Sequence, residues 1–210
     1  MRIEAPRTAN SHDPKLQKIL AAAKEAFLEH GYAAASMDLV ARRAKASKTT
    51  VYTRFPSKEA LFAATIVTEC ERHGMLFRAE DFDHLPLDDA LLRIGGRFLD
   101  LVWSPEALRM HRIVMGEAAR FPEVARVFFD TGFVQTGEAV ARFFIRAKER
   151  GLIAVDDPAF TARQFLVTLK GFPDCGISLG LCEPPPTVER EAYLRKVIGE
   201  FLRGVAAPPA

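Results

Sequence analysis

The apolar positions of the first third of the chain repeat with the period of an α-helix. Between positions 14 and 30 they lie on one helical face, and they end just before Gly31, a residue type that commonly follows the last turn of a helix. The residues of this face are Leu16, Ile19, Leu20, Ala23 and Phe27. The pattern therefore predicts a first helix over 14–30.

Two short helices are predicted to follow, each beginning after a serine. Ser36 precedes an apolar pattern over 37–44, and Ser47 precedes a second pattern that Pro56 ends. Only two residues separate the second helix from Ser47, and such a short turn is typical of a helix-turn-helix module. The inward-facing residues expected to form its small core are Leu20, Phe27, Val40, Val51 and Phe55.

The rest of the chain is also helical in pattern, with no convincing alternating strand beyond residue 80. Its breakers delimit predicted helices over 88–103, 106–120, 122–151, 158–180 and 187–204. Pro173 lies inside the fourth of these and is expected to kink or split it. We therefore predict an all-α fold. Its expected parts are a disordered arm (1–12), a helix-turn-helix domain (13–60), a larger helical regulatory and dimerisation domain (61–205) and a loose tail (206–210).

Charge distinguishes the beginning of the chain from the remainder. Residues 1–58 hold 11 Lys and Arg against 5 Asp and Glu, whereas the whole chain has a net charge of only +2. This positive excess favours an anionic partner, either nucleic acid or an anionic membrane surface. A solvated basic face would have the same composition, so charge alone does not decide.

The remaining composition excludes several protein classes. With 49% hydrophobic residues the chain can bury a core, which excludes a wholly disordered protein. It contains no apolar run long enough for a membrane span, and residues 1–12 lack the apolar region of a secretory signal. Three cysteines, Cys70, Cys175 and Cys182, are too few for a disulfide framework and fit a reducing cytoplasm. Because no metal-ligand cluster or cofactor motif is present, we expect neither metal nor cofactor.

The outward face of the third predicted helix has the chemistry of a DNA-reading surface. Its side chains supply hydrogen-bond donors, positive charge and an aromatic ring, and they include no carboxylate that would face a phosphate. The residues are Lys48, Thr49, Thr50, Tyr52, Thr53 and Arg54. The alternative, an ordinary solvated helix face, would normally carry charges of both signs.

The same part of the chain resembles the DNA-binding domain of TetR/AcrR-type transcriptional regulators. The resemblance extends from Ile19 to Phe62, ILAAAKEAFLEHGYAAASMDLVARRAKASKTTVYTRFPSKEALF. Lys45 stands where the family often has glycine, and Arg54 where it often has tyrosine or histidine. A weaker resemblance to the AefR-like regulatory domain rests on segments 110–114, 117–123, 157–158, 164–166 and 201–204.

The resemblance implies a homodimer whose two recognition helices enter successive major grooves of double-stranded DNA at a palindromic operator. Side chains expected near phosphates are those of Ser36, Ser47, Tyr52 and Lys58. Side chains expected at base edges are those of Lys48, Thr49 and Thr50. Arg54 could read guanine or pair with a phosphate, and Thr53 belongs to the same outward face.

Members of this family release DNA when a small molecule binds in the C-terminal bundle and changes the angle of the fourth helix. Such a molecule must bind the conformation that does not fit DNA more tightly. The bundle is rich in phenylalanine, which favours an apolar or aromatic effector. Candidate pocket residues are Arg97, Phe98, Trp103, Met110, Glu117, Phe133, Gln135 and Phe172. By the same resemblance, the last two helices are expected to form the dimer interface.

A ligand-responsive repressor is therefore the leading interpretation, and two alternatives remain. One is a regulator of the same fold that a protein partner controls, or that oxidation of Cys175 or Cys182 controls. The other is an enzyme or carrier built on the helical bundle. The paired carboxylates Asp88-Asp89 and Asp156-Asp157 precede predicted helices, where they suit caps or first turns better than acid–base catalysis.

Overall fold

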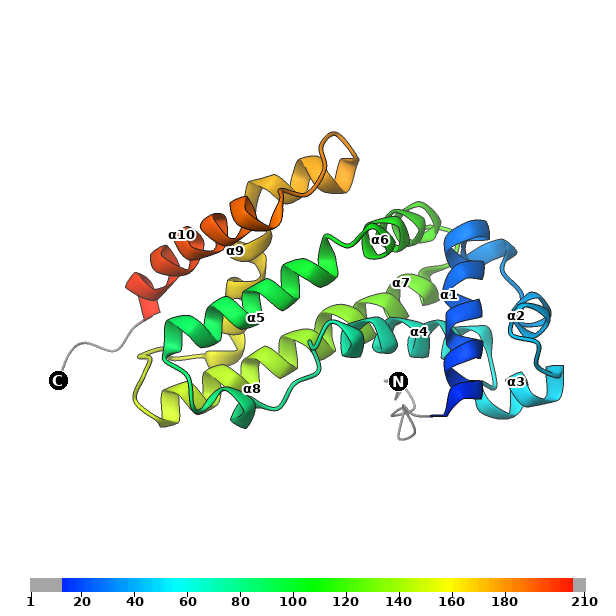
Figure 1. Ribbon diagram of the computed structural model, residues 1–210, viewed down its shortest axis with the longest axis horizontal. Helices are drawn as coiled ribbons and strands as arrows, with labels where there is room; N and C mark the ends of the chain where they lie inside the picture. Colours follow the sequence, from blue (N-terminus) through cyan, green and yellow to red (C-terminus); the bar gives the residue numbers. More distant parts are fainter. Residues whose placement is uncertain (1–12, 206–210) are drawn as a thin grey trace. The chain divides into compact units, whose positions relative to one another are not determined.

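The computed structural model describes residues 13–205, and all of its regular structure in that range is helical (Figure 1). The predicted all-α fold is thus confirmed, while the predicted arm 1–12 and tail 206–210 lie outside the described residues. The helices are α1 (Pro14–Ala34), α2 (Met37–Arg43), α3 (Lys48–Arg54), α4 (Lys58–Arg72), η1 (Ala79–Phe82), α5 (Leu87–Val102), α6 (Pro105–Glu117), α7 (Pro122–Phe128), η2 (Phe129–Val134), α8 (Gln135–Glu149), α9 (Pro158–Leu179) and α10 (Thr187–Val205).

Side-chain caps fix the beginnings of the first three helices. The Asp13 carboxylate accepts hydrogen bonds from the backbone N–H groups of Lys15 (2.9 Å) and Leu16 (3.4 Å) at the start of α1. Ser36 and Ser47 accept from the third residue beyond them, at 3.1 Å each, and begin α2 and α3. Both serine caps that the sequence predicts are therefore present, and each satisfies an N–H group that the helix itself leaves unpaired.

The end of α1 is less regular than the sequence suggests. Gly31 has φ +75°, so the predicted stop after residue 30 is a real break. The chain nevertheless makes one further turn, which the Ala35 N–H closes by donating to the Gly31 carbonyl at 3.2 Å. We call residues 31–35 the α1 hook. Lys45, in the turn between α2 and α3, has φ +52°, a left-handed conformation that costs a residue with a Cβ roughly 1–2 kcal/mol.

The described chain forms two compact units. Unit 1 contains the residues up to Arg72 together with Pro105–Val134, and unit 2 contains His73–Ser104 together with the residues from Gln135 onward. In unit 1, α4, α6 and α7 pack together with α1–α3.

Unit 1 is built on α1, which packs against α2, α4 and α6. The five core residues predicted for the helix-turn-helix module are all buried. Aromatic rings extend this core toward the α1 hook. The rings of Phe27 and Phe62 meet edge to face at 5.1 Å between centroids, and Tyr32 contacts Phe62 at 5.5 Å and Phe121 at 5.9 Å. The third helix is therefore carried by a core that α4 and α7 help to form.

Unit 2 contains α5, α8, α9 and α10, with α8 against α9 and α5 against α10. The helix predicted over 122–151 is present as a continuous helical stretch from Pro122 to Glu149, in which the π-helical turn η2 separates α7 from α8. A second predicted feature is shifted. The break expected at Pro173 in α9 occurs two residues earlier, at Gly171 (φ +52°), and Figure 1 shows the change of direction. The early break follows from Pro173, which lacks an N–H for the preceding turn.

Candidate nucleic-acid interface

The outward face of α3 presents most of its predicted DNA-binding side chains to solvent. Lys48, Thr49, Thr53 and Arg54 belong to exposed residues, and the Tyr52 side chain is 49% exposed. Val51, on the opposite face, is fully buried in unit 1. The helix is thus anchored by its apolar side and offers its polar side, the geometry required to enter a DNA groove.

Hydroxyl groups on this face are partly engaged within the helix. The Ser47 and Thr50 hydroxyl oxygens lie 2.8 Å apart, and Ser47 also caps the helix. The Thr53 hydroxyl donates to the Thr49 carbonyl at 2.8 Å. These hydrogen bonds hold the side chains of Thr50 and Thr53 in one orientation. Their methyl groups therefore have fixed positions on the surface.

Lys48 is paired with an aspartate of the preceding helix. Its Nζ lies 2.5 Å from Oδ2 of Asp38, which belongs to the first turn of α2. The lysine side chain is 67% exposed and the aspartate side chain 42% exposed. Such a pair is open to solvent and is only weakly stabilising.

Arg54, at the other end of α3, is paired with Asp13. Its Nη2 donates to Oδ2 of Asp13, while Oδ1 of the same carboxylate caps α1. The backbone N–H groups of Lys15 and Leu16, with the Arg54 guanidinium, hold the pKa of Asp13 below its usual value. One carboxylate thus joins the start of α1 to the end of α3.

Lys58 has contacts within the protein that the resemblance does not imply. Its Nζ donates to the carbonyl oxygens of Ala35 (2.8 Å) and Ala33 (3.2 Å) in the α1 hook, and it lies 4.2 Å from the centroid of the Tyr32 ring. Burial lowers the pKa of this lysine. Its ammonium group therefore closes the C-terminal end of α1, where backbone carbonyls lack helical partners.

Two glutamates complete the polar contacts of the α1 hook. The Tyr32 hydroxyl donates to Oε1 of Glu59 at 2.8 Å, and burial together with this carboxylate raises the pKa of the phenol. Glu117, the last residue of α6, accepts a hydrogen bond from the Ala33 N–H through Oε2 at 2.9 Å. Its other oxygen lies so close to Gly31 that a Cβ there would collide with it. The hook is thereby joined to both α4 and α6.

The residues predicted to line a ligand pocket have diverse environments. In unit 2, the Trp103 Nε1 donates to Asp174 at 3.0 Å, and the Arg97 guanidinium lies over the Phe82 ring at 5.4 Å. Phe98 and Met110 are buried in the cores of their units, whereas Phe133 and Phe172 are 44% and 90% exposed. Glu117 holds the α1 hook, and Gln135 is half-buried at the start of α8. Phe172 is thus a surface residue of unit 2.

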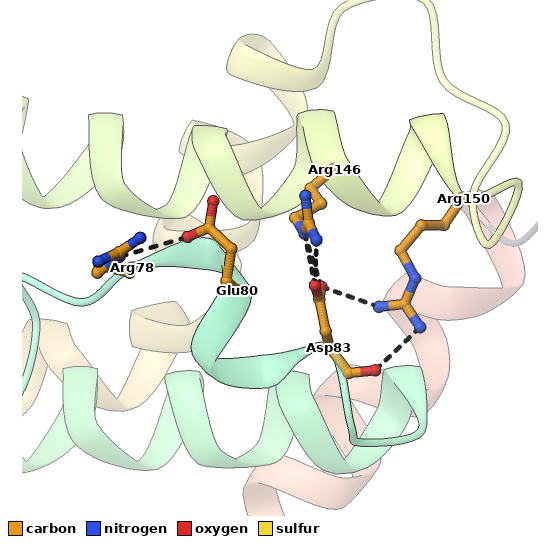
Figure 2. Close-up of polar contacts among 5 residues, drawn as sticks. All are labelled: Arg78, Glu80, Asp83, Arg146 and Arg150. Carbon is orange, nitrogen blue, oxygen red and sulfur yellow. Dashed lines mark hydrogen bonds and ion pairs between the residues drawn. The ribbon is translucent and has the colours of Figure 1, made fainter.

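Unit 2 contains a small hollow that the sequence analysis did not predict. Its lining includes the apolar residues Phe82, Leu85, Leu87 and Phe143 together with the charged residues Asp83, Arg146 and Arg150. Figure 2 shows Arg146 of α8 and Arg150, the residue after α8, converging on Asp83.

The Asp83 contacts are numerous. The Arg146 Nε donates to its two carboxylate oxygens at 2.7 and 2.8 Å, and the Arg150 Nη2 donates to its backbone carbonyl at 3.0 Å. The Arg146 guanidinium holds the pKa of Asp83 below its usual value. These contacts tie the connection after η1 to the last turns of α8. The sequence contained a signal for this cluster. Two arginines four residues apart near the end of a predicted helix repel each other, and a nearby carboxylate removes that repulsion.

Residues 13–205 contain no group of three His, Cys, Asp or Glu side chains placed to hold a metal ion. Cys70 is buried, while Cys175 and Cys182 are exposed, and all three are free thiols. None of the helices in this range is both long and apolar enough to cross a membrane.

Comparison with known proteins gives consistent matches over both parts of the chain. Residues 19–65 match the family model of bacterial regulatory proteins of the tetR family, and residues 89–204 match that of the AefR-like transcriptional repressor C-terminal domain. The HTH-type transcriptional regulator UidR of Escherichia coli K12 is 32% identical over 154 residues, covering 73% of this chain and 76% of UidR. A Mycobacterium bovis HTH-type regulator, Mb1581, is 30% identical over 152 residues, covering 72% and 71%.

Solved structures agree with these sequence matches. A putative TetR-family regulator from Mesorhizobium loti superposes with a TM-score of 0.78 at 25% identity, covering 92% of this chain and 97% of its own. The flavonoid-responsive regulator FrrA superposes with a TM-score of 0.74 at 34% identity, covering 93% and 98%.

Proposed function

Since the chain belongs to the TetR family of transcriptional regulators, which are DNA-binding proteins and not enzymes, we propose that it is a homodimeric repressor that an apolar or aromatic molecule releases from its operator. It would act in the cytoplasm, where the bacterial chromosome lies. The observation that carries the DNA-binding part is the α3 surface, an exposed polar face without a carboxylate on a helix anchored by buried Val51. Two such helices in a dimer would read half-sites about 34–36 Å apart.

Exposed apolar side chains on the last two helices support the dimer. Large apolar residues on α9 and near the start of α10 are more than half exposed. They are Phe160, Val167, Phe172, Leu179, Leu181 and Val188. Because a soluble monomer seldom leaves so many large apolar side chains in water, a second copy of this chain is the proposed occupant of this surface.

The aromatic character of the effector has two supports. The bundle is rich in phenylalanine, as the sequence indicates, and FrrA, 34% identical to this chain, is described as flavonoid-responsive. A flavonoid therefore makes a better first probe than an aliphatic acid. Such an effector releases DNA only if its affinity is higher for the conformation that does not fit DNA than for the conformation that does.

The proposal is tested by fluorescence anisotropy on an operator selected from random duplexes. The wild-type protein should bind the selected duplex far more tightly than a scrambled one, and a flavonoid such as naringenin should weaken that binding at least tenfold. Decanoate serves as the aliphatic control. A selected operator that neither compound releases would contradict the aromatic-effector part, and failure to select any operator would contradict DNA reading itself.

A further inference from the structure

Both basic side chains of α3 are already engaged by carboxylates of the same unit. Lys48 pairs with Asp38 of α2, and Arg54 pairs with Asp13 at the start of α1. The positive charge that the sequence assigns to the recognition surface is therefore locally compensated before any DNA arrives. The sequence of α3 contains no carboxylate. The carboxylates of Asp38 and Asp13 nevertheless contact its two basic side chains.

The two pairs differ in how firmly they are held. Asp13 is fixed by two backbone N–H groups, and the side chains of Asp13 and Arg54 are only 24% and 35% exposed. In the other pair, Asp38 and Lys48 are 42% and 67% exposed. Water and ions compete readily for such an exposed pair, so Lys48 can exchange Asp38 for another anion. Arg54 is a positioning residue, whereas Lys48 is the exchangeable cation.

DNA phosphate is the anion that would compete. A lysine that neutralises a phosphate releases a condensed counterion, and this release makes up most of non-specific affinity. A lysine held by Asp38 must first give up that carboxylate, so its gain from an arbitrary phosphate is reduced. The same cost applies at the operator, because Lys48 must leave Asp38 there too before it can contact DNA.

From this arrangement we infer that Asp38 sets the affinity of the α3 surface for DNA: its carboxylate competes with DNA for Lys48 and lowers binding to operator and non-specific duplexes alike. The inference rests on the proposed docking of α3 in the major groove. It assigns a function to a residue outside the recognition helix, in the first turn of α2, where a carboxylate is also favoured by the helix dipole.

Asp38→Asn tests the inference through non-specific binding. The variant should bind a scrambled duplex about three- to tenfold more tightly than wild type, and the slope of log K against log salt should steepen by up to about 0.9. Its operator affinity should rise by a similar factor, so the ratio of operator to scrambled affinity should stay within about twofold of the wild-type ratio. Asp88→Asn is the matched control, because it removes an aspartate from the first turn of α5 in the other unit.

A second background separates competition for Lys48 from a simple loss of negative charge. In Lys48→Gln protein, Asp38→Asn should leave scrambled-duplex affinity and its salt slope unchanged within about twofold. An equal gain in the Lys48→Gln background, an equal gain from Asp88→Asn, or no gain in Asp38→Asn would each overturn the inference. A wild-type protein that binds no duplex would overturn the proposed function as well, and the wild-type titration alone identifies that case.

Discussion

Two lysines near the recognition surface differ in what their ammonium groups contact. Lys48 is exposed and pairs with a single carboxylate, whereas Lys58 donates to two carbonyls of the α1 hook and lies over the Tyr32 ring. A hydrogen bond makes a net contribution of about 1 kcal/mol to the stability of a fold, and a partly desolvated cation–π contact makes a similar contribution. An exposed ion pair adds much less. The two lysines should therefore respond differently to the same substitution.

Lys58→Gln should lower the free energy of unfolding by about 1–2 kcal/mol, because the hook carbonyls lose their donor and the Tyr32 ring loses its cation. Lys48→Gln should change the same quantity by no more than about 0.5 kcal/mol. Urea denaturation followed by circular dichroism measures both. Equal stability of the two variants, combined with uniformly weaker DNA binding by Lys58→Gln, would instead assign Lys58 to the phosphate backbone.

The α1 hook depends on one glycine for two reasons. Gly31 has φ +75°, and Glu117 of α6 approaches it so closely that a Cβ would collide with the carboxylate. Gly151 has a similar φ of +71°, but a Cβ there would meet nothing within 4 Å. Alanine substitutions at Gly31 and Gly151 therefore distinguish the effect of backbone strain from the effect of the contact with Glu117.

Gly31→Ala should destabilise the protein more than Gly151→Ala, which should cost roughly 1–2 kcal/mol for the left-handed backbone alone. The extra loss should disappear when Gly31→Ala is introduced into Glu117→Ala protein and compared with Glu117→Ala alone, because the nearby carboxylate is then absent. Denaturant midpoints of the four variants give the comparison. Equal losses at the two glycines would show that the Glu117 carboxylate moves away from the new Cβ without a measurable cost.

At the scale of elements, the connection after η1 is held to α8 through Asp83. The Arg146 guanidinium holds the pKa of Asp83 below its usual value, so the folded state favours the carboxylate. The stability that this contributes is present above the ordinary aspartate pKa, near 3.9, and is lost as the pH falls through the lower value of the folded state.

The melting temperature of the wild type should therefore decrease more between pH 5 and pH 3 than that of Asp83→Asn, which should already be less stable at pH 7. Asp130→Asn, in the η2 turn of the other unit, should keep the wild-type pH dependence. Differential scanning calorimetry across this pH range makes the measurement. Parallel curves for the wild type and Asp83→Asn would show that the Asp83 pair does not stabilise unit 2.

Local signals explain which elements the sequence predicted. Ser36, Ser47 and Gly31 act within three residues of themselves, so caps and the α1 break could be read directly. The π-helical turn over 129–134 could not, because apolar periodicity continues through it without a proline. The Glu117 contact with Ala33 joins residues 84 positions apart. Its existence depends on how α6 packs against α1, which no local pattern records.

For the whole molecule, the proposed dimer uses the apolar residues exposed on α9 and α10. Phe160 and Val167 are seven residues apart, so they share one face of α9 before its break at Gly171. Val167→Asp places a charge on that face and should convert the dimer to a monomer at micromolar concentration. Phe129→Asp is the control, because Phe129 is a similarly exposed apolar residue (57%) that belongs to unit 1 and not to α9 or α10.

Sedimentation velocity distinguishes the two forms. The wild type and Phe129→Asp should sediment at about twice the mass of the 23.3 kDa chain, and Val167→Asp at about that mass. Retention of the dimer by Val167→Asp would place the interface elsewhere.

This chain is proposed to read DNA as a dimer through α3. The most direct test is an anisotropy titration of three duplexes at two salt concentrations: the selected operator, the same duplex with one half-site scrambled, and a fully scrambled one. One dimer should bind the operator in a salt-sensitive way, about a thousandfold more tightly than the scrambled duplex, and should lose much of this affinity when one half-site is scrambled. Equal affinity for all three duplexes, or no binding at low salt, would contradict this proposal.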